Sequence, residues 1–305
     1  MIATNYKKVL IYSIVTILFI SSCATRVTDN GGDGGGDTLF PALGVDSLVE
    51  VVTWNVLFPG DFNTDYWTID KEDKMADLIR SMDVDLLAIQ EFPSQGQMDQ
   101  LLAKLPGFGG ILSPDINYNQ KTGLIYRKET VTAEISNPRN IPGTYTRAPL
   151  PIDIRVSNQY GTFSARLIVI HFKAGGSTSD HERRTVENRD MEVYINDYVS
   201  LNPDKYIILL GDFNDTLDDS VVHAPWYQDP DKYNFSTDKI WDNPLMASLP
   251  SWGSMIDHLL LNQSLYQAEG PYLDGETITI IFNNLVSGYG DVSDHRPVMS
   301  KFKYK

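Results

Sequence analysis

Two short motifs in the second half of the chain carry residue types suited to metal binding and proton transfer. Gly211-Asp212-Phe213-Asn214 follows an apolar, strand-like run, and Ser293-Asp294-His295 precedes one. Polar residues also occur in four further segments: Trp54-Asn55, Gln90-Glu91, Val169-Ile170-His171 and Ile256-Asp257-His258. Carboxylates, amides and imidazoles are the groups that bind a hard cation and move protons at a phosphate. The combination predicts a metal-dependent phosphoesterase.

Three of these residues are candidate ligands for the cation. Glu91 follows the buried-strand pattern of residues 84–89, and Asn55 and Asp294 can complete its shell. Mg²⁺ prefers oxygen ligands and usually takes only one or two protein carboxylates. Considered singly, Glu91 is typical of a solvated loop and Asn55 of a turn. The metal site is therefore predicted from the joint pattern.

Other residues are candidates for proton transfer and phosphate contact. Asp257 and His295 can form a pair in which the carboxylate fixes the imidazole tautomer and raises its basicity. Asp212 can donate or accept a proton, Asn214 can donate its amide to a phosphate oxygen, and His171 ends an apolar strand. The alternatives are turn formers for Asp212 and Asn214 and a buried structural histidine for His171.

The elements that must position these residues alternate between strand and helix patterns. Apolar and β-branched runs predict strands over residues 48–57, 84–89, 123–127, 152–156, 162–171, 205–210, 255–261 and 297–302. Helical spacing predicts helices over residues 71–82, 97–105 and 180–200. Because strands also follow one another directly in the middle of the chain, we expect α/β layers with mixed, mostly antiparallel sheets.

The N-terminus has the pattern of a bacterial lipoprotein signal peptide. Lys7 and Lys8 precede an apolar run over residues 9–20, which is too short to span a membrane, and Ser21-Ser22-Cys23 follows. We expect a signal peptide over residues 1–23 with lipidation of Cys23, the alternative being a secretory signal with an incidental Cys. A Gly/Asp-rich tether over residues 24–46 then leads to one domain over residues 47–305.

The expected location and the net charge of the chain limit which partners it can have. We expect an exported, monomeric lipoprotein held to a membrane through Cys23 and facing the periplasm or the cell surface. The formal net charge of −15 disfavours tight, nonspecific binding to polyanions. Divalent cations and a few local basic residues can still invert the field at one site, so nucleic acid stays open as a partner.

The six polar motifs, in this order over about residues 51–302, resemble the endonuclease/exonuclease/phosphatase superfamily, whose members include DNase I-like nucleases. The resemblance implies a four-layer α/β sandwich, with two mixed, mostly antiparallel β-sheets packed face to face and flanked by helices. It also implies Mg²⁺, or Mn²⁺, as cofactor and a phosphate-ester substrate.

The resemblance also assigns roles to the residues. Glu91 looks like the principal metal ligand, with Asn55 and Asp294 nearby. Asp212 looks like the residue that activates the nucleophile or protonates the leaving group. The remaining assignments are the Asp257–His295 catalytic dyad and the phosphate contacts His171, Asn214 and, from Thr146-Arg147-Ala148-Pro149, Arg147.

Two positions depart from the family pattern. Leu57 stands where some repair nucleases have an Asp as a further metal ligand, which puts a second metal shell in doubt. His258 follows Asp257 where many members have an apolar residue, and adjacent strand residues face opposite sides. We therefore leave His258 out of the predicted site.

The substrate is set by loops, which the motifs do not fix. The aromatic-rich segment over residues 215–254 can stack on bases or sugars, or can pack a long loop onto the domain. Our first expectation is an extracytoplasmic nuclease. The alternatives are a phosphatase or phosphodiesterase acting on a small or lipid-derived ester, of the inositol phosphate or sphingomyelin type, and an inactive surface-binding lipoprotein.

Overall fold

The computed structural model describes residues 43–56, 67–114, 120–136, 141–282 and 292–305. The predicted signal peptide with Cys23, most of the tether, and Leu57 lie outside these residues. No helix in the described ranges is both long enough and apolar enough to cross a membrane.

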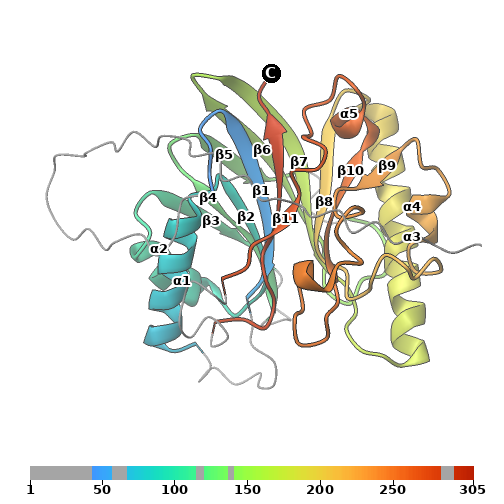
Figure 1. Cartoon of the computed structure of the whole chain (residues 1–305), viewed down its shortest axis with the longest axis horizontal. Helices are drawn as coiled ribbons and strands as arrows, with labels where there is room; N and C mark the ends of the chain where they lie inside the picture. Colours follow the sequence, from blue (N-terminus) through green and yellow to red (C-terminus); the bar gives the residue numbers. More distant parts are fainter. Residues whose placement is uncertain (1–42, 57–66, 115–119, 137–140, 283–291) are drawn as a thin grey trace, which may run out of the picture. The chain divides into compact units, whose positions relative to one another are not determined.

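Two six-stranded β-sheets form the centre of the fold (Figure 1). The first sheet contains, in spatial order, β11 (Ile278–Thr279), β12 (Val298–Lys303), β1 (Leu48–Asn55), β2 (Leu86–Phe92), β4 (Lys121–Arg127) and β3 (Phe108–Leu112). The second contains β5 (Val131–Ile135), β6 (Leu150–Asn158), β7 (Gly161–His171), β8 (Tyr206–Asp212), β10 (Asp257–Asn262) and β9 (Tyr233–Phe235). Among these neighbours, the pairs β1–β2 and β7–β8 are parallel and the others are antiparallel.

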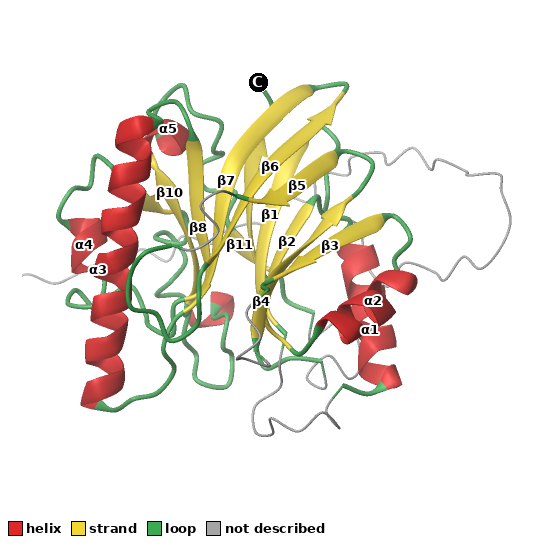
Figure 2. Ribbon diagram, turned by 180° about the vertical axis from the view of Figure 1, so that it is seen from behind, coloured by secondary structure: helices red, strands yellow, loops and turns green. Residues whose placement is uncertain are grey.

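Helices cover the outer faces of the sheets (Figure 2). α1 (Ile69–Met82) and α2 (Gln95–Ala103) lie beside the first sheet, and α3 (Thr178–Leu201) and α4 (Ala224–Tyr227) lie beside the second. The short α5 (Gln263–Tyr266) and the 3₁₀ turn η2 (Pro244–Met246) complete the helical elements of the described chain. The Thr68 side chain caps α1 by accepting from the Lys71 N–H, and Ser177 and Asp180 form a capping box on α3.

Side chains alternate between the two faces of each sheet and form three separate apolar interfaces. Four stacked layers have three interfaces between them. In β1, Val52 and Trp54 pack with the α1 and α2 side chains, whereas Val49 and Val51 face the other sheet. The same alternation in β8 sends one set of residues toward the first sheet and the other toward α3. Because strand side chains alternate between faces, one apolar run can serve two interfaces. The predicted four-layer sandwich is confirmed.

The strands that sequence patterns missed are short or weak. β3 reads Phe-Gly-Gly-Ile-Leu, and glycine lowers strand propensity. β5 has five residues and β9 and β11 have three and two, and all three lie at sheet edges. Pairing with a longer neighbour orders these segments, and pairing is not visible in a local pattern.

The topology collects polar residues at one edge of the sandwich. β1 and β2 run in parallel with Asn55 opposite Gln90, so both strands end near the same edge. β7 and β8 also run in parallel, with His171 opposite Asp212, and β10 begins at Asp257, which pairs with Asp212. These chain ends meet at one rim because parallel neighbours share a direction.

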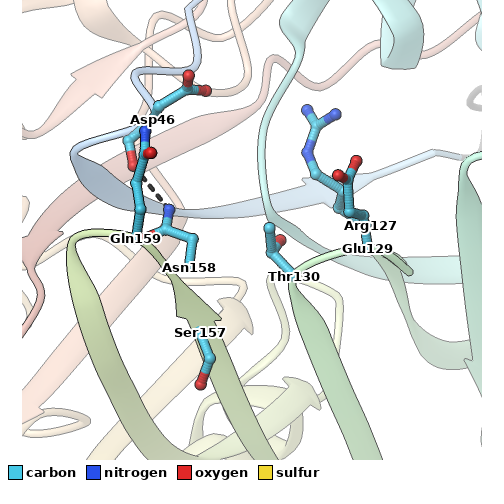
Figure 3. Close-up of a pocket in the computed structure, with 7 residues that line it drawn as sticks. All are labelled: Asp46, Arg127, Glu129, Thr130, Ser157, Asn158 and Gln159. Carbon is cyan, nitrogen blue, oxygen red and sulfur yellow. Dashed lines mark hydrogen bonds between the residues drawn. The ribbon is translucent and has the colours of Figure 1, made fainter.

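The opposite ends of these strands border a polar hollow of about 460 Å³ (Figure 3). Its lining residues are Asp46, Arg127, Glu129, Thr130, Ser157, Asn158 and Gln159. They come from the start of β1, the turn between β4 and β5, and the end of β6. The hollow therefore contains none of the residues predicted to carry chemistry.

Candidate active site

The second sheet contributes a row of three site residues at its polar edge. His171, Asp212 and Asp257 lie on the adjacent strands β7, β8 and β10 and are cross-strand partners in that order. All three are buried. The strand register thus turns residues far apart in the sequence into direct neighbours.

The first sheet contributes a second row from β12, β1 and β2. Asp294 and His295 lie in the loop just before β12, Asn55 ends β1, and Glu91 lies near the end of β2. The Asn55 amide joins the two rows, because its Nδ2 donates to Asp212 Oδ2 at 3.0 Å and to Glu91 Oε1 at 3.1 Å. The structure therefore brings together the predicted residues of both sheets.

Asp212 is the middle member of the second-sheet row and contacts Asn55 of the other row. Besides the Asn55 contact, the backbone N–H of Asn214 donates to its Oδ1 at 2.8 Å. Burial and the charge of Asp257 raise the pKa of Asp212 to about 7, although His295 and Asn55 oppose the shift. A carboxyl with a pKa near 7 can hold or release a proton at neutral pH, which suits acid–base chemistry.

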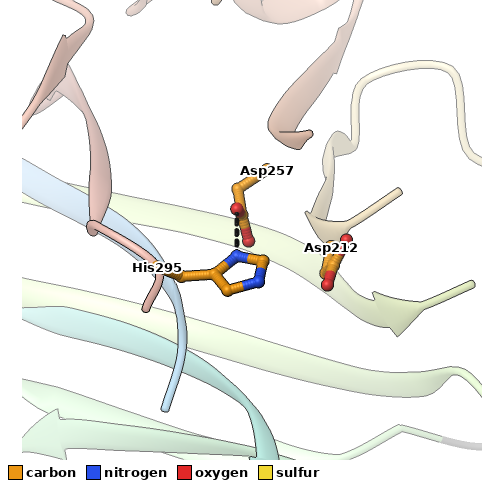
Figure 4. A group of neighbouring side chains, drawn as sticks. All are labelled: Asp212, Asp257 and His295. Atoms are coloured by element: carbon orange, nitrogen blue, oxygen red, sulfur yellow. Dashed lines mark hydrogen bonds and ion pairs between the residues drawn. The ribbon is translucent and has the colours of Figure 1, made fainter. Parts of the chain in front are cut away.

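Asp257 and His295 form a buried pair (Figure 4). His295 Nδ1 lies 2.7 Å from Asp257 Oδ2, and Asp212 lies beyond the ring, on the side of the other nitrogen. Burial lowers the pKa of His295, but the charge and hydrogen bond of Asp257 outweigh it and raise the pKa to about 10. His295 is therefore an imidazolium at neutral pH and presents positive charge to the site.

Glu91 interrupts the regular course of β2. Its φ is 58°, and the β2–β4 register shifts between Ile89 and Phe92. Left-handed backbone is uncommon for a residue other than glycine, and such strain is concentrated at functional sites. The Glu91 carboxylate accepts from Asn55 on one oxygen and from Gln120 Nε2, at 3.1 Å, on the other. Burial raises the pKa of Glu91 above its ordinary value.

His171 is buried between the two acids. Its Nε2 lies 3.5 Å from Glu91 Oε1 and 3.7 Å from Asp212 Oδ2. Burial, reinforced by the positive charges of Arg147 and His295, lowers the pKa of His171 well below 6.5. The ring is therefore neutral at physiological pH and carries one N–H that can serve as a donor.

The backbone carbonyl of Phe172 holds two of the predicted phosphate contacts. Asn214 Nδ2 and Arg147 Nη1 each donate to it at 3.1 Å. Arg147 Nη2 also donates to Gln120 Oε1 at 2.7 Å, which links the guanidinium to Glu91 through Gln120. These bonds fix Arg147 and Asn214 beside the two rows of site residues.

The acidic residues fit the divalent cation that the family resemblance implies. Burial raises the pKa of Glu91, Asp212 and Asp294, and Asp257 Oδ1 has no hydrogen-bond partner within the described ranges. A bound cation would offset the cost of burying these acids, and carboxylate oxygens are ligands that Mg²⁺ prefers. Glu91 and Asp294 supply such oxygens. Asn55 Nδ2 donates to Glu91 and Asp212, and the metal-ligand role of the Asn55 amide oxygen stays a prediction.

Several residues that stabilise the site were not assigned a role from the sequence. Ser293 Oγ donates to the Asn55 carbonyl at 2.6 Å and accepts from the His295 N–H at 3.0 Å. Trp54 Nε1 donates to the His295 carbonyl at 3.0 Å. Ser293 and Trp54 both belong to the sequence motifs of the site, so the sequence did mark them as candidates for supporting residues.

Two other supporting residues carry no local signal. Gln120 lies beside β4, which reaches the site only because it is antiparallel to β2. Ser248 Oγ accepts from the Asp257 N–H at 3.1 Å and lies in an irregular segment before β10. Only tertiary structure identifies this pair.

His258 lies on the other side of β10 from Asp257. Its ring packs against Phe213 and Phe235, and its nitrogens contact Thr237 Oγ1 at 2.8 Å and the Asp215 carbonyl at 3.1 Å. His258 therefore supports the Asp212–Asn214 loop from beneath and takes no place among the two rows.

Most aromatic side chains of residues 215–254 pack into the protein. Trp226, Tyr233 and Phe235 belong to the apolar cluster under α3, and Trp226 Nε1 donates to Asn188 Oδ1 at 2.7 Å. Trp252, by contrast, is 79 % exposed. The segment is largely a packed loop, and Trp252 is its most exposed large hydrophobic side chain among the described residues.

Comparison with known proteins identifies the same architecture. A sequence profile described as the Endonuclease/Exonuclease/phosphatase family matches residues 52–295. No curated protein sequence matches the chain.

Solved structures agree at low sequence identity. TDP2 from Caenorhabditis elegans has a TM-score of 0.58 and 13 % identity, covering 84 % of this chain and 74 % of that one. The human Nocturnin catalytic domain with bound sulfate has a TM-score of 0.58 and 15 % identity, covering 86 % of this chain and 96 % of that one. D. rerio TDP2 complexed with a single-strand DNA product has a TM-score of 0.57 and 17 % identity, covering 85 % of this chain and 100 % of that one. At these identities the likeness concerns the fold.

Proposed function

The chain belongs to the endonuclease/exonuclease/phosphatase family, a family of phosphate-ester hydrolases, and we propose that it is a Mg²⁺-dependent phosphodiesterase acting as an extracytoplasmic nuclease. One observation carries the proposal. Asn55, Glu91, Asp212, Asp257 and His295 come from separate strands or strand ends, yet hydrogen bonds link Glu91, Asn55 and Asp212, and Asp257 with His295. The ligand atoms of Asp212, Asp257 and His295 lie within 4.8 Å of one another. Packing alone does not require so many buried ionisable groups in one place.

The residues of the site have complementary tasks in hydrolysis. Asp212, with its pKa of about 7, takes a proton from the attacking water or gives one to the leaving oxygen. His295, held at Nδ1 by Asp257, offers positive charge to the phosphoryl oxygens. A water molecule attacks phosphorus directly, so the reaction needs no covalent enzyme intermediate.

Further hydrogen-bond donors complete the phosphate site, two of them neutral and one the cationic Arg147 guanidinium. His171 contributes one N–H, and the Asn214 amide and the Arg147 guanidinium are held beside it by the Phe172 carbonyl. A cation held by Glu91 and Asp294 would neutralise negative charge on the phosphate and help to orient it. Fixed donors of this kind stabilise the transition state because they need no rearrangement during the reaction.

Nucleic acid is the proposed substrate class, and a phosphate-bearing lipid or sugar is the alternative. The related fold of D. rerio TDP2 is seen with a single-strand DNA product, and that of Nocturnin with a sulfate anion. The net charge of −15 favours short or single-stranded nucleic acid over long duplexes. We also propose that Cys23 is lipidated and anchors the exported chain, which cell fractionation of wild type and Cys23→Ser would test.

A substrate panel tests the proposal. The full-length protein is assayed with single-stranded DNA, duplex DNA, RNA, sphingomyelin, inositol phosphates and bis(4-nitrophenyl) phosphate, in EDTA, Mg²⁺ or Mn²⁺. We expect metal-dependent cleavage of single-stranded nucleic acid and a loss of about 10²–10⁴-fold in Glu91→Gln. Melting temperature with and without Mg²⁺ reports cation binding independently of turnover.

The outcomes separate the candidates. Cleavage of lipid or sugar esters alone would replace the nuclease by the alternative. Absence of hydrolysis on every substrate, by a folded protein that binds Mg²⁺, would overturn the phosphoesterase and favour a binding lipoprotein. Full activity of folded Glu91→Gln would refute the site assignment.

A further inference from the structure

Lys71, in the first turn of α1, is a buried lysine that neither the motifs nor the proposed mechanism uses. The residue is 3 % exposed, and its Nζ has no hydrogen-bond acceptor within the described ranges. Most lysine ammonium groups reach water or an acid, because burying an unpaired charge is costly. Other lysines of this region are paired with acids: Lys74 with Asp70, and Lys104 with Glu72 and Asp73.

The chain path brings Lys71 to the edge that carries the active site. β1 ends at Asn55, α1 follows, and β2 returns parallel to β1. In such a crossover the helix begins near the edge where the first strand ends. Side chains in helices also lean toward the helix N-terminus, and therefore toward the same edge.

Neighbouring side chains hold the Lys71 ammonium at the edge of the sandwich that carries the active site. Lys71 Nζ lies 5.7 Å from the centre of the Trp67 ring. That ring packs edge-on against the Phe92 ring, with the two ring centres 4.9 Å apart. Phe92 directly follows Glu91. Trp67 is held in turn by Glu72, whose Oε2 accepts from its Nε1 at 3.0 Å.

The charges that act on Lys71 belong to the candidate metal ligands. Glu91 and Asp294, from different strands, attract the ammonium electrostatically and oppose the effect of its burial. A cation with open hydrogen-bond capacity beside the ligands of a phosphate-binding metal is suited to a phosphate oxygen.

We propose that Lys71 is a substrate-binding residue that donates to a non-bridging oxygen of the phosphate at the Glu91–Asp294 site. The proposal rests on the phosphoesterase function proposed above. Lys71 supplies positive charge on the first-sheet side of the phosphate, while His295 and Arg147 supply it elsewhere in the site. Its position in a helix backed by Trp67 and Phe92 holds the ammonium in place before substrate arrives.

Kinetics of the full-length protein test this role. Wild type, Lys71→Met, Lys71→Arg and the control Lys104→Met are compared on bis(4-nitrophenyl) phosphate at saturating Mg²⁺, with inorganic phosphate as inhibitor. We expect Lys71→Met to raise KM and the phosphate inhibition constant about 10- to 100-fold, the effect of losing one charged hydrogen bond. Lys71→Arg should restore part of the phosphate inhibition, and Lys104→Met should behave as wild type.

Two measurements without turnover exclude a merely structural role. Calorimetry of inorganic phosphate binding to the Mg²⁺-loaded protein should show the same weakening in Lys71→Met. The melting temperature of Lys71→Met should stay level or rise, because methionine removes a buried, unpaired charge at similar volume. If Lys71→Met does not fold, Lys71→Gln takes its place.

Several results would overturn the proposal. Unchanged KM and phosphate affinity, with tighter Mg²⁺ binding in Lys71→Met, would make Lys71 a counter-charge for the metal ligands. An equal loss in Lys104→Met would make the effect one of general surface charge. If wild type hydrolyses no ester, the phosphoesterase proposal fails, while phosphate calorimetry still decides whether Lys71 belongs to an anion site.

Discussion

His171 and His295 carry the same side chain but hold different charges in the same site. His171 is buried beside Arg147 and His295, and both the burial and these charges lower its pKa. His295 is also buried, yet its contact with Asp257 raises its pKa to about 10. One partner carboxylate thus converts a neutral hydrogen-bond donor into a cation. The sequence identifies both histidines as candidates, but only their neighbours assign their charge.

The Asp257–His295 pair gives a prediction at this scale. Asp257→Asn keeps the shape of the side chain but removes the charge that orients and protonates His295. We expect kcat to fall by about 10²–10⁴-fold with little change in melting temperature. Steady-state kinetics and thermal unfolding measure the two quantities.

The matched control for this variant is Asp229→Asn, which breaks an exposed pair with Lys232. That change should leave kcat unaltered, because the pair lies on the surface. Wild-type turnover in Asp257→Asn would remove the dyad from the mechanism.

At the scale of the elements, the register of β7, β8 and β10 aligns His171, Asp212 and Asp257. Gly211 permits this register, because its φ is 144° and a Cβ at this position would lie 2.0 Å from the Ile170 carbonyl oxygen. Glycine adopts such backbone freely, whereas other residues are strained there. The Gly-Asp-Phe-Asn motif therefore combines a backbone requirement with a chemical one.

Gly211→Ala should consequently destabilise the protein. The methyl group meets backbone, which cannot move aside like a flexible side chain, and the positive φ adds strain. We expect a loss of about 3 kcal/mol or more in the free energy of unfolding, measured by urea titration. Gly176→Ala is the control, because no atom lies within 4 Å of its added Cβ. Similar losses in the two variants would contradict this role of Gly211.

At the scale of the whole molecule, buried acids lie at both edges of the sandwich. Away from the active site, Glu50 at the start of β1 accepts from the Val45 N–H at 2.8 Å and lies near Asp85. Burial raises the pKa of Glu50 from 4.5 to about 8, with the charge of Asp85 adding to the effect. Folding therefore favours the protonated form of this residue.

This linkage predicts a pH-dependent stability. A raised folded-state pKa gives a contribution that is fully present below pH 4.5 and is lost as pH rises toward 8. Glu50→Gln should match wild type near pH 4 and exceed it by on the order of 3 kcal/mol near pH 9. Urea unfolding of both proteins across this range gives the difference directly. Parallel stability curves for the two proteins would show that Glu50 is not the titrating group.

The sequence by itself determined the residue types of the site, their order along the chain, and the main strands and helices. These follow from short motifs and from apolar periodicity, which are local properties. It also predicted the four-layer fold through family resemblance. It did not reveal the short edge strands, because their order depends on pairing with neighbours.

Only the tertiary structure decided which polar residues meet and what charge each carries. Gln120 and Ser248 reach the site through strand pairing and loop packing, and Lys71 reaches its edge through the β1–α1–β2 crossover. Most of the aromatic segment turned out to be core, while Trp252 stayed exposed. The physical reason is that hydrogen bonding, burial and pKa depend on distances between segments remote in sequence, and these distances exist only once the two sheets have packed.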